Sequence, residues 1–355
     1  MRRRDAIACK FSIMRTFLIL AMVLASRPFA VGAANLLTFY FIDVEGGQST
    51  LIVTPAGDSL LVDSGYAANG RDSSRILAAV RDAGVHKIDH LLLTHFHTDH
   101  IGGVAELIGK IPTGTFYDHG VLGQPPGQSA LVAASLAAYE KYIALRGIAK
   151  HVEPRVGSAF PLKGVTATWV SSAGMTIRTA LSGAGEANAS CPVAAPPPDE
   201  QSYQENSRST GFYLRFGKFR FVDLGDLVGL PLFSLICPAN RLGQVDLYLL
   251  PHHGNVDAGY PATFAAFHPR IAVINNGPAK GGAADVFEQL RQVGGVEDVW
   301  QLHRAVDPKT RNFADDHIAN IDESTAHWLK VTAAADGSFT VTNGRTGQSR
   351  QYAAR

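Results

Sequence analysis

The sequence predicts an α/β fold in which strands come first and then alternate with helices. Short apolar runs, bounded by glycine, proline or aspartate, recur from residue 37 onward and read as strands. Several of these runs are followed by segments in which apolar residues recur with the period of a helix. The content of 46% apolar and 18% charged residues is that of an ordinary globular protein.

The first half of the chain supplies the clearest element signals. A break at Glu45-Gly46-Gly47 separates the first two expected strands, and Gly84 lies near the end of the first expected helix. The run 90–94 is continuously apolar, which is typical of a strand buried on both faces. Strands are expected at residues 37–44, 49–53, 59–62 and 90–94, and helices at residues 72–85, 102–111 and 129–145.

The second half begins with an unusual stretch at residues 172–207. Glycine, alanine, serine and proline dominate it, so we expect an irregular loop insertion, either a lid or binding loop or a mobile surface excursion. Regular elements return after it, and the last two expected strands flank a hairpin turn at Asp336-Gly337. Strands are expected at residues 211–216, 219–224, 245–250, 271–274, 299–302, 326–332 and 338–342, and helices at residues 262–267 and 284–293.

The first 33 residues have the composition of a secretory signal peptide. Five basic residues precede an apolar run at 17–25, and Val31-Gly32-Ala33 follows with the small residues of a cleavage site. The apolar run is about half the length that a membrane span needs, and we expect no span after the signal is removed. We therefore expect residues 34–355 to be a single domain that is secreted or periplasmic.

Removal of residues 1–33 changes the charge of the chain. The segment takes away 6 of 32 basic and 1 of 31 acidic residues, which leaves 26 basic and 30 acidic residues and a net charge of −4. This gives no strong sign of nucleic-acid binding, which usually requires a basic face, and favours a small-molecule substrate; the oligomeric state stays open. Cys191 and Cys237 remain, and either a disulfide or two unpaired thiols is compatible with an oxidising compartment.

The residues with the strongest chemical signal lie in the run 94–103, THFHTDHIGG, which directly follows an expected strand. At the end of a strand His95 and His97 point the same way, and the turn that follows presents Asp99 and His100. Imidazole nitrogens with a carboxylate suit Zn²⁺, or Mn²⁺ and Fe when oxygen ligands increase. The run therefore predicts a metal site.

Three further motifs accompany this run: Asp63-Ser64-Gly65 before it, and Gly225-Asp226 and His252-His253-Gly254 after it. In order and spacing the chain resembles the metallo-β-lactamase superfamily over most of residues 34–355. The resemblance implies an αββα sandwich of two mixed sheets flanked by helices, and a hydrolase with two divalent metal ions. The His-His-Gly ending is most similar to that of the ComEC-like competence-protein branch and of phosphorylcholine-esterase-like relatives.

The resemblance also implies a role for each motif residue. His95 and His97 would bind the first ion, Asp99 and His100 the second, and Asp226 both. Adjacent histidines cannot both face one site from a regular strand, so one of the final pair would complete the second site. The favoured assignment is His253 as ligand and His252 as acid or phosphate contact, and Asp63 is expected to orient a ligand from behind.

The chain departs from the family pattern at one position. Many members supply a third histidine to the first ion about 20 residues before the bridging aspartate, and residues 205–209 (ENSRS) contain none. Asn206 can take that place, as a weak ligand, through water or as a substrate contact; alternatively His119 reaches the first ion. His303, at the end of an expected strand, is a further candidate for contacting the substrate.

Together these features predict an exported hydrolase that uses a metal-activated water. Asp99 would orient the water and accept its proton, and His252 or His303 would protonate the leaving group. The His-His-Gly ending favours a phosphoester or phosphodiester, whereas export and the acidic charge favour a lactone, β-lactam or other carboxylic ester. A non-catalytic metal-dependent binding protein and a di-iron redox enzyme are the alternatives of other classes, since a fold alone does not decide function.

Overall fold

A computed structural model describes residues 36–123, 130–147, 149–196, 205–259 and 261–355. The expected signal peptide, residues 1–33, lies outside the described residues. Ala34–Arg355 form one compact unit. In the part of the chain that is described, no helix combines the length and apolarity that a membrane crossing requires.

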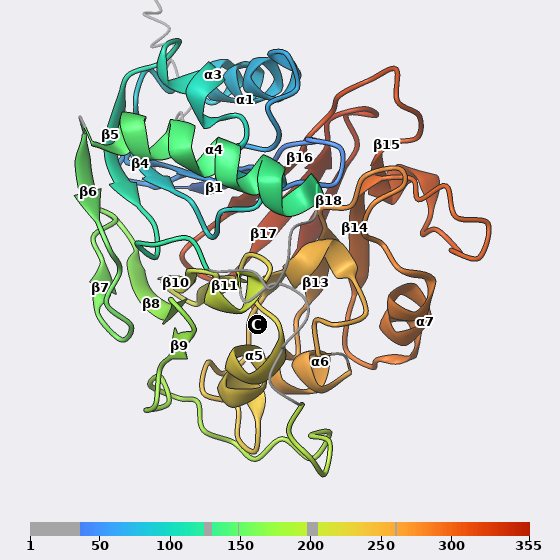
Figure 1. The fold of residues 1–355 in the computed structure, drawn as a ribbon. Helices are drawn as coiled ribbons and strands as arrows, with labels where there is room; N and C mark the ends of the chain where they lie inside the picture. The colour runs from blue at the N-terminus through green and yellow to red at the C-terminus, as the bar shows by residue number, and fades with distance from the viewer. Residues whose placement is uncertain (1–35, 124–129, 148, 197–204, 260) are drawn as a thin grey trace, which may run out of the picture. The chain divides into compact units, whose positions relative to one another are not determined.

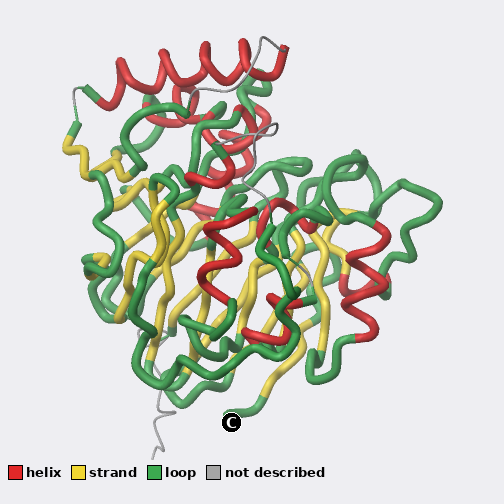
Figure 2. The backbone as a smooth tube through the Cα atoms, turned by 60° about the horizontal axis from the view of Figure 1, so that its bottom comes forward, coloured by secondary structure: helices red, strands yellow, loops and turns green. Residues whose placement is uncertain are grey.

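Two mixed sheets of nine strands each form the centre of this unit (Figures 1 and 2). In the first sheet β3 to β6 are parallel and the other neighbours antiparallel. In chain order its strands are β1 (Leu37–Phe41), β2 (Thr50–Val53), β3 (Ser59–Val62), β4 (Ile88–Leu92), β5 (Thr113–Tyr117), β6 (Lys150–Val152), β16 (Leu329–Ala333), β17 (Phe339–Asn343) and β18 (Ser349–Tyr352).

The second sheet has the same mixed character. Strands β11 to β15 are parallel, and β7, β8, β9 and β10 pair antiparallel to their neighbours. Its strands are β7 (Ala159–Phe160), β8 (Thr166–Ser172), β9 (Met175–Thr176), β10 (Gly211–Phe216), β11 (Phe219–Asp223), β12 (Leu247–Leu249), β13 (Ile271–Ile274), β14 (Asp298–His303) and β15 (Ile318–Asn320).

The helices cover the outer faces of the two sheets (Figure 1). The first sheet carries α1 (Arg71–Asp82), α2 (Thr98–Ile101), α3 (Val104–Ile108) and α4 (Ala130–Arg146), and the second carries α5 (Gly229–Ile236), α6 (Ala262–Phe267) and α7 (Ala284–Gln292). Short 3-10 turns occur at η2 (Asn206–Arg208), η3 (Pro251–Gly254) and η4 (Asp315–His317). The predicted αββα sandwich is therefore confirmed.

The alternation of side chains along β1 explains how the layers are held together. Phe39 and Phe41 point between the sheets, where Phe39 packs against Phe221 of the second sheet at 4.8 Å between ring centroids. Tyr40 points the other way, into the layer beneath α1 and α4. Because successive side chains of a strand face opposite sides, one strand contributes to two apolar layers, and the central strands are apolar on both faces.

Several element boundaries differ from the expectation. The helix expected at 102–111 is shorter, α3 at Val104–Ile108, and a separate short helix, α2 at Thr98–Ile101, precedes it. Between them the chain at Gly103 passes close to Ser64: a Cβ there would lie 2.2 Å from the Ser64 carbonyl oxygen. Strands β6 to β9, β15 and β18 and helix α5 were not predicted. These strands are short or lie at or near the sheet edges, where the pattern of apolar residues is weak.

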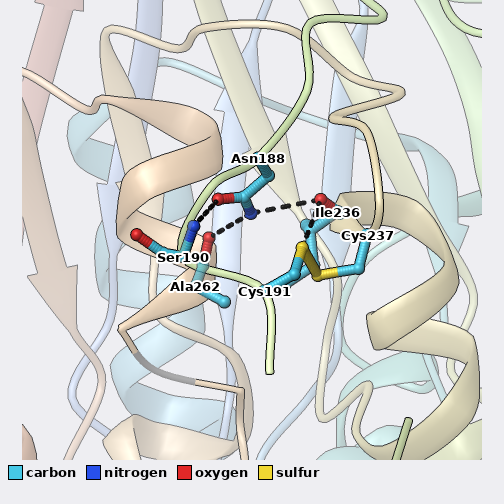
Figure 3. Close-up of a disulfide and its surroundings, with 6 residues drawn as sticks. All are labelled: Asn188, Ser190, Cys191, Ile236, Cys237 and Ala262. Atoms are coloured by element: carbon cyan, nitrogen blue, oxygen red, sulfur yellow. Dashed lines mark hydrogen bonds between the residues drawn. A yellow bond between two sulfur atoms is a disulfide. The ribbon is translucent and has the colours of Figure 1, made fainter. Parts of the chain in front are cut away.

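The described part of the loop at 172–207 is tied to the layer of α5. Cys191 and Cys237 form a disulfide, which settles the alternative left open by the sequence (Figure 3). Beside it the Asn188 amide donates to the carbonyls of Ile236 and Ala262 at 3.1 and 2.9 Å. Backbone hydrogen bonds join residues 181–188 to residues 238–241. This part of the loop is thus joined to the layer of α5 by a disulfide and by hydrogen bonds.

We expect the disulfide to stabilise the domain by restricting the unfolded chain. It closes a loop with a sequence separation of 46 residues, for which the chain-entropy model gives about 4 kcal/mol. The Cys191→Ser/Cys237→Ser variant should therefore unfold at a lower denaturant concentration, with a slope that is equal or steeper because its unfolded chain is less compact. An identical midpoint for the variant and the oxidised parent would contradict this prediction.

Candidate metal centre

The candidate site lies where parallel strands of the two sheets end. In the first sheet, Asp63 follows β3 and the run from His95 to His100 follows β4. In the second sheet, Asp226 follows β11 and η3 follows β12. The carboxyl ends of parallel strands share one edge of a sheet, which is where α/β proteins commonly build their sites.

The polar side chains from these loops form two groups that share one carboxylate. Asp99, His100, Asp226 and His253 make the first group, which is the set expected for the second ion. His95, His97 and Asp226 make the second group, which is the set expected for the first ion. Within each group the ligand atoms lie within 4.8 Å of one another. The Asp226 Oδ2 atom lies 3.2, 3.3 and 3.7 Å from the Nε2 atoms of His100, His253 and His95. These are the two sets that the resemblance assigned to two ions.

The unpaired atoms in these groups fit a divalent metal ion. His100 Nε2 and Asp226 Oδ1 are buried and make no hydrogen bond, although buried polar atoms are normally paired. They converge with further imidazole and carboxylate atoms, a donor set that suits Zn²⁺, Mn²⁺ or Fe²⁺. The residues present therefore fit two ions, with Asp226 contacting both.

The electrostatics of the groups favour the metal-binding form of Asp226 and His95, but not that of His100. Burial acts to raise the pKa of Asp226, but His100 and His253 outweigh it and hold the pKa well below its usual value. Burial lowers the pKa of the His95 imidazole well below its usual value. The pKa of His100 is instead raised: burial opposes this, but the charges of Asp226 and Asp99 prevail. A metal ion in the first group would therefore displace a proton from His100.

A carboxylate behind His100 fixes the orientation of its ring. His100 Nδ1 donates to Asp63 Oδ2 at 2.7 Å, which leaves Nε2 directed at Asp99 and Asp226. Asp63 in turn accepts hydrogen bonds from the backbone nitrogen and the hydroxyl of Thr94, both at 2.7 Å. This is the orienting role expected for Asp63, and such partners raise the basicity of the ligand they hold.

The two adjacent histidines of η3 point to different places because both have a left-handed backbone, with φ of 49° and 55°. His253 Nε2 reaches the first group and lies 3.1 Å from Asp99 Oδ2. His252 lies at the rim, where its Nδ1 is 2.7 Å from Asp257 Oδ1 and its Nε2 is 4.0 Å from Asp226 Oδ2. His253 is therefore the member of the pair that joins the group with Asp99 and His100, and His252 lies beside it at the rim.

Asn206 lies beside this rim histidine. Its Nδ2 atom is 3.4 Å from His252 Nε2, and its Oδ1 atom is buried without a hydrogen bond. The side chain comes from η2, which precedes β10. Asn206 is therefore at the position where the sequence placed a substrate contact or a weak ligand.

Two other candidates, His119 and His303, belong to neither group. His119 follows β5 and faces Phe96 and Glu205, with its Nε2 atom 2.8 Å from Glu205 Oε1. His303 ends β14 and is 1% exposed; its Nε2 atom lies 3.5 Å from Asp43 Oδ2, and neither ring nitrogen has a hydrogen-bond partner among the described residues. The structure thus places both candidates outside the two groups.

Glu205 positions the histidine run and was not predicted. Its carboxylate accepts hydrogen bonds from the backbone nitrogens of Phe96 and Gly123 at 2.8 and 2.7 Å, and lies 2.8 Å from His119. Burial acts to raise its pKa, but these bonds lower it below the usual value. The partners lie 82 to 109 residues away in sequence, so no local pattern could have indicated them.

A second hidden carboxylate shapes the turn that carries Asp226. Asp223 accepts from Gln48 Nε2 at 3.1 and 3.0 Å and from the backbone nitrogen of Gly225 at 2.9 Å. Burial raises the pKa of Asp223 to about 7. Gly225 has a φ of 56°, and a Cβ there would lie 2.7 Å from Thr94 Cβ. The glycine before Asp226 is therefore required by the close approach of the histidine run.

Comparison with known proteins shows which family this domain is similar to. A family model described as the metallo-beta-lactamase superfamily matches residues 42–176. Over residues 42–176 the chain is therefore similar to the metallo-β-lactamase superfamily, in agreement with its fold and its two groups of potential ligands. Among solved structures, the metallo-beta-lactamase fold protein YhfI from Bacillus subtilis aligns with 75% of this chain and 96% of its own at 15% identity, with a TM-score of 0.46.

Three curated relatives are similar over shorter stretches. Competence protein ComA of Neisseria gonorrhoeae is 37% identical over 108 residues, 30% of this chain and 14% of ComA. Ribonuclease Z of Mycobacterium sp. (strain KMS) is 37% identical over 108 residues, 30% of this chain and 35% of that protein. Thioesterase pkgB of Emericella nidulans is 35% identical over 85 residues, 24% of each chain. The matched stretches thus span about a third or less of these relatives.

The shared carboxylate predicts an unequal effect of two substitutions on metal content. Asp226→Asn should lower the occupancy of both groups, because both use Asp226. His253→Ala should lower only that of the group with Asp99 and His100. Metal analysis by mass spectrometry after dialysis against limiting metal tests this, with His86→Ala, an exposed histidine between α1 and β4, as the control. Equal losses in the two variants would contradict the assignment.

Loss of the Glu205 carboxylate should destabilise the fold. Glu205→Ala would leave two backbone donors and His119 without their partner, at about 1–3 kcal/mol for each buried group, so a loss of about 3 kcal/mol or more is expected. Glu205→Gln retains an acceptor oxygen and should lose less. Denaturant unfolding of the metal-free variants measures both, and a loss within about 0.5 kcal/mol for Glu205→Ala would show that the bonds carry little stability.

Proposed function

We propose that this chain is an exported dinuclear metal-dependent hydrolase that acts on a phosphoester or phosphodiester. The observation that carries the proposal is the pair of histidine and aspartate groups that share the buried Asp226 carboxylate. The similarity to proteins named ribonuclease Z supports a phosphodiester as the substrate class. The similarity to ComA agrees with the competence-protein branch.

When bound, two divalent ions would supply Lewis acidity and lower the pKa of a water held between them. The residues around them would orient the reactants and move protons. Burial acts to raise the pKa of Asp99, but the charges of His100 and Lys280 hold the pKa well below its usual value. Asp99 is therefore ionised and would accept the proton of the attacking water. Asn206 would donate its amide hydrogens to an oxygen of the substrate.

His252 would give a proton to the leaving group. Burial acts to lower its pKa, but the hydrogen bond to Asp257 and the charge of Asp226 raise the pKa above the usual value. The protonated form of the imidazole is thus favoured, with Asp257 at its Nδ1 and its Nε2 on the side of Asp226 and Asn206. A general acid must carry a proton before the reaction and give it up in the transition state.

Export is supported by two features. The first 33 residues have the pattern of a signal peptide. The Cys191–Cys237 disulfide is of a kind that persists in oxidising compartments and is rare in the cytosol of mesophiles. We therefore propose that residues 34–355 act in the periplasm or outside the cell.

A second candidate is the hydrolysis of a carboxylic ester, thioester, lactone or β-lactam. The similarity to thioesterase pkgB favours it, and the same residues would serve an acyl group, since a metal centre polarises C=O and P–O bonds alike. A non-catalytic metal-dependent binding protein is disfavoured because the described chain retains each ligand that the resemblance assigned. We propose Zn²⁺ as the metal, with Mn²⁺ and Fe as alternatives.

Metal analysis and a turnover screen together test the proposal. We expect the purified chain to hold about two metal ions and to hydrolyse bis-p-nitrophenyl phosphate at a rate that a chelator abolishes and added metal restores. Turnover of nitrocefin or an acyl-lactone alone would favour the second candidate. Metal without turnover of any of the three substrates would favour a binding protein.

The acid role of His252 predicts a dependence on the leaving group and on pH. His252→Gln should slow substrates with a poor leaving group by about 10²–10⁴-fold and p-nitrophenyl substrates much less. Activity that needs protonated His252 is lost as pH rises through its pKa. Asp257→Asn removes a group that raises this pKa, so the alkaline limb of kcat should move to lower pH. An unmoved limb would assign the acid to another group.

A further inference from the structure

Lys280 is a cation at the edge of the metal centre that the mechanism above leaves without a substrate role. Its ammonium contacts Asp99 Oδ2 and lies 3.1 Å from Tyr66 Oη. The side chain of Lys280 is 38% exposed and that of Asp99 6%, so the lysine joins the buried group to the surface. Among the described residues, no other lysine or arginine forms an ion pair with Asp99 or Asp226.

The loop that carries Lys280 is fixed to the centre on two sides. On one side, the Gly282 backbone nitrogen donates to the His253 carbonyl at 2.9 Å, and a Cβ on Gly281 would lie 2.4 Å from the same oxygen. On the other side, a Cβ on Gly46 would lie 2.9 Å from Lys280 Cβ. These close contacts need glycine, and together they hold the lysine against the group that contains Asp99.

The position of Lys280 suits a charged side chain, because its ammonium contacts the Asp99 carboxylate and lies close to the Tyr66 hydroxyl. Asp99 also belongs to the group that fits a metal ion, and an ion there would compete with the ammonium for the same carboxylate oxygen. The four-carbon stem of lysine is flexible, so its ammonium can turn from Asp99 to a bound anion without movement of the loop.

We propose that Lys280 binds an anionic oxygen of the substrate, so that the site selects substrates that carry negative charge at the reacting group. Lysine binds phosphate oxygens as a compact point charge, and a phosphomonoester or phosphodiester offers such an oxygen next to the bond that breaks. A neutral ester or lactone offers none. The inference rests on the proposed hydrolase function and narrows its substrate class.

The test compares Lys280→Met with Lys280→Arg, which keeps the charge, and with Lys150→Met, an exposed lysine at the start of β6. Each metal-loaded protein is measured for metal content, for the Kd of inorganic phosphate by calorimetry, and for kcat/KM on bis-p-nitrophenyl phosphate and p-nitrophenyl acetate. Lys280→Gln is a second neutral variant, and the thermal midpoint of each protein reports whether it is folded.

We expect Lys280→Met and Lys280→Gln to retain their metal and to bind phosphate at least about tenfold more weakly, as for a lost hydrogen bond to a charged group. The value of kcat/KM for the phosphodiester should fall similarly, and any value for the acetate should change less than about twofold. Lys280→Arg should stay within about threefold of the parent, and Lys150→Met should match it.

Two results would overturn the inference. An unchanged phosphate Kd in metal-retaining neutral variants would exclude Lys280 as the receptor. Loss of metal from both neutral variants would show that Lys280 only supports Asp99. Failure of the proposed function would give another result. If the parent hydrolyses only neutral esters while phosphate binding still depends on Lys280, the phosphoesterase proposal is wrong and the anion-binding role of Lys280 is retained.

Discussion

The carboxylate of Asp226 lies within 4 Å of the histidines of both metal groups, and the rest of the centre is arranged to keep it there. The turn that carries it is closed by Asp223, and its glycine at position 225 lets β11 end close to Thr94. A buried carboxylate in this position would be costly if it were left without positive charge. Ions bound by the two groups would therefore supply positive charge that offsets the free-energy cost of burying Asp226.

The first half of the site could be predicted because its residues are local. His95, His97, Asp99 and His100 lie within six positions, and a strand followed by a turn is sufficient to bring them together. Asp226 and His253 required the resemblance as well, since they come from the other sheet. The choice of His253 over its neighbour follows from the left-handed backbone of η3, which no propensity for strand or helix indicates.

The residues that sequence reasoning misplaced or missed depend on tertiary neighbours. His119 and His303 follow or end strands as the ligands do, but His119 contacts Glu205 and His303 lies near Asp43, and neither joins the two groups. Glu205 and Lys280 act through partners 109 and 181 residues away. The same limit applies to the fold: the central apolar strands were found, whereas short strands such as β7 and β9 depend on pairing with β8.

The central claim is that two ions share Asp226, and electron paramagnetic resonance of the Mn²⁺-loaded protein tests it most directly. Two Mn²⁺ ions joined by one carboxylate should give the spectrum of an exchange-coupled pair, and Asp226→Asn should abolish the coupling. A spectrum of isolated Mn²⁺ at two ions per chain, unchanged in that variant, would contradict the account, because the two groups would then be independent sites.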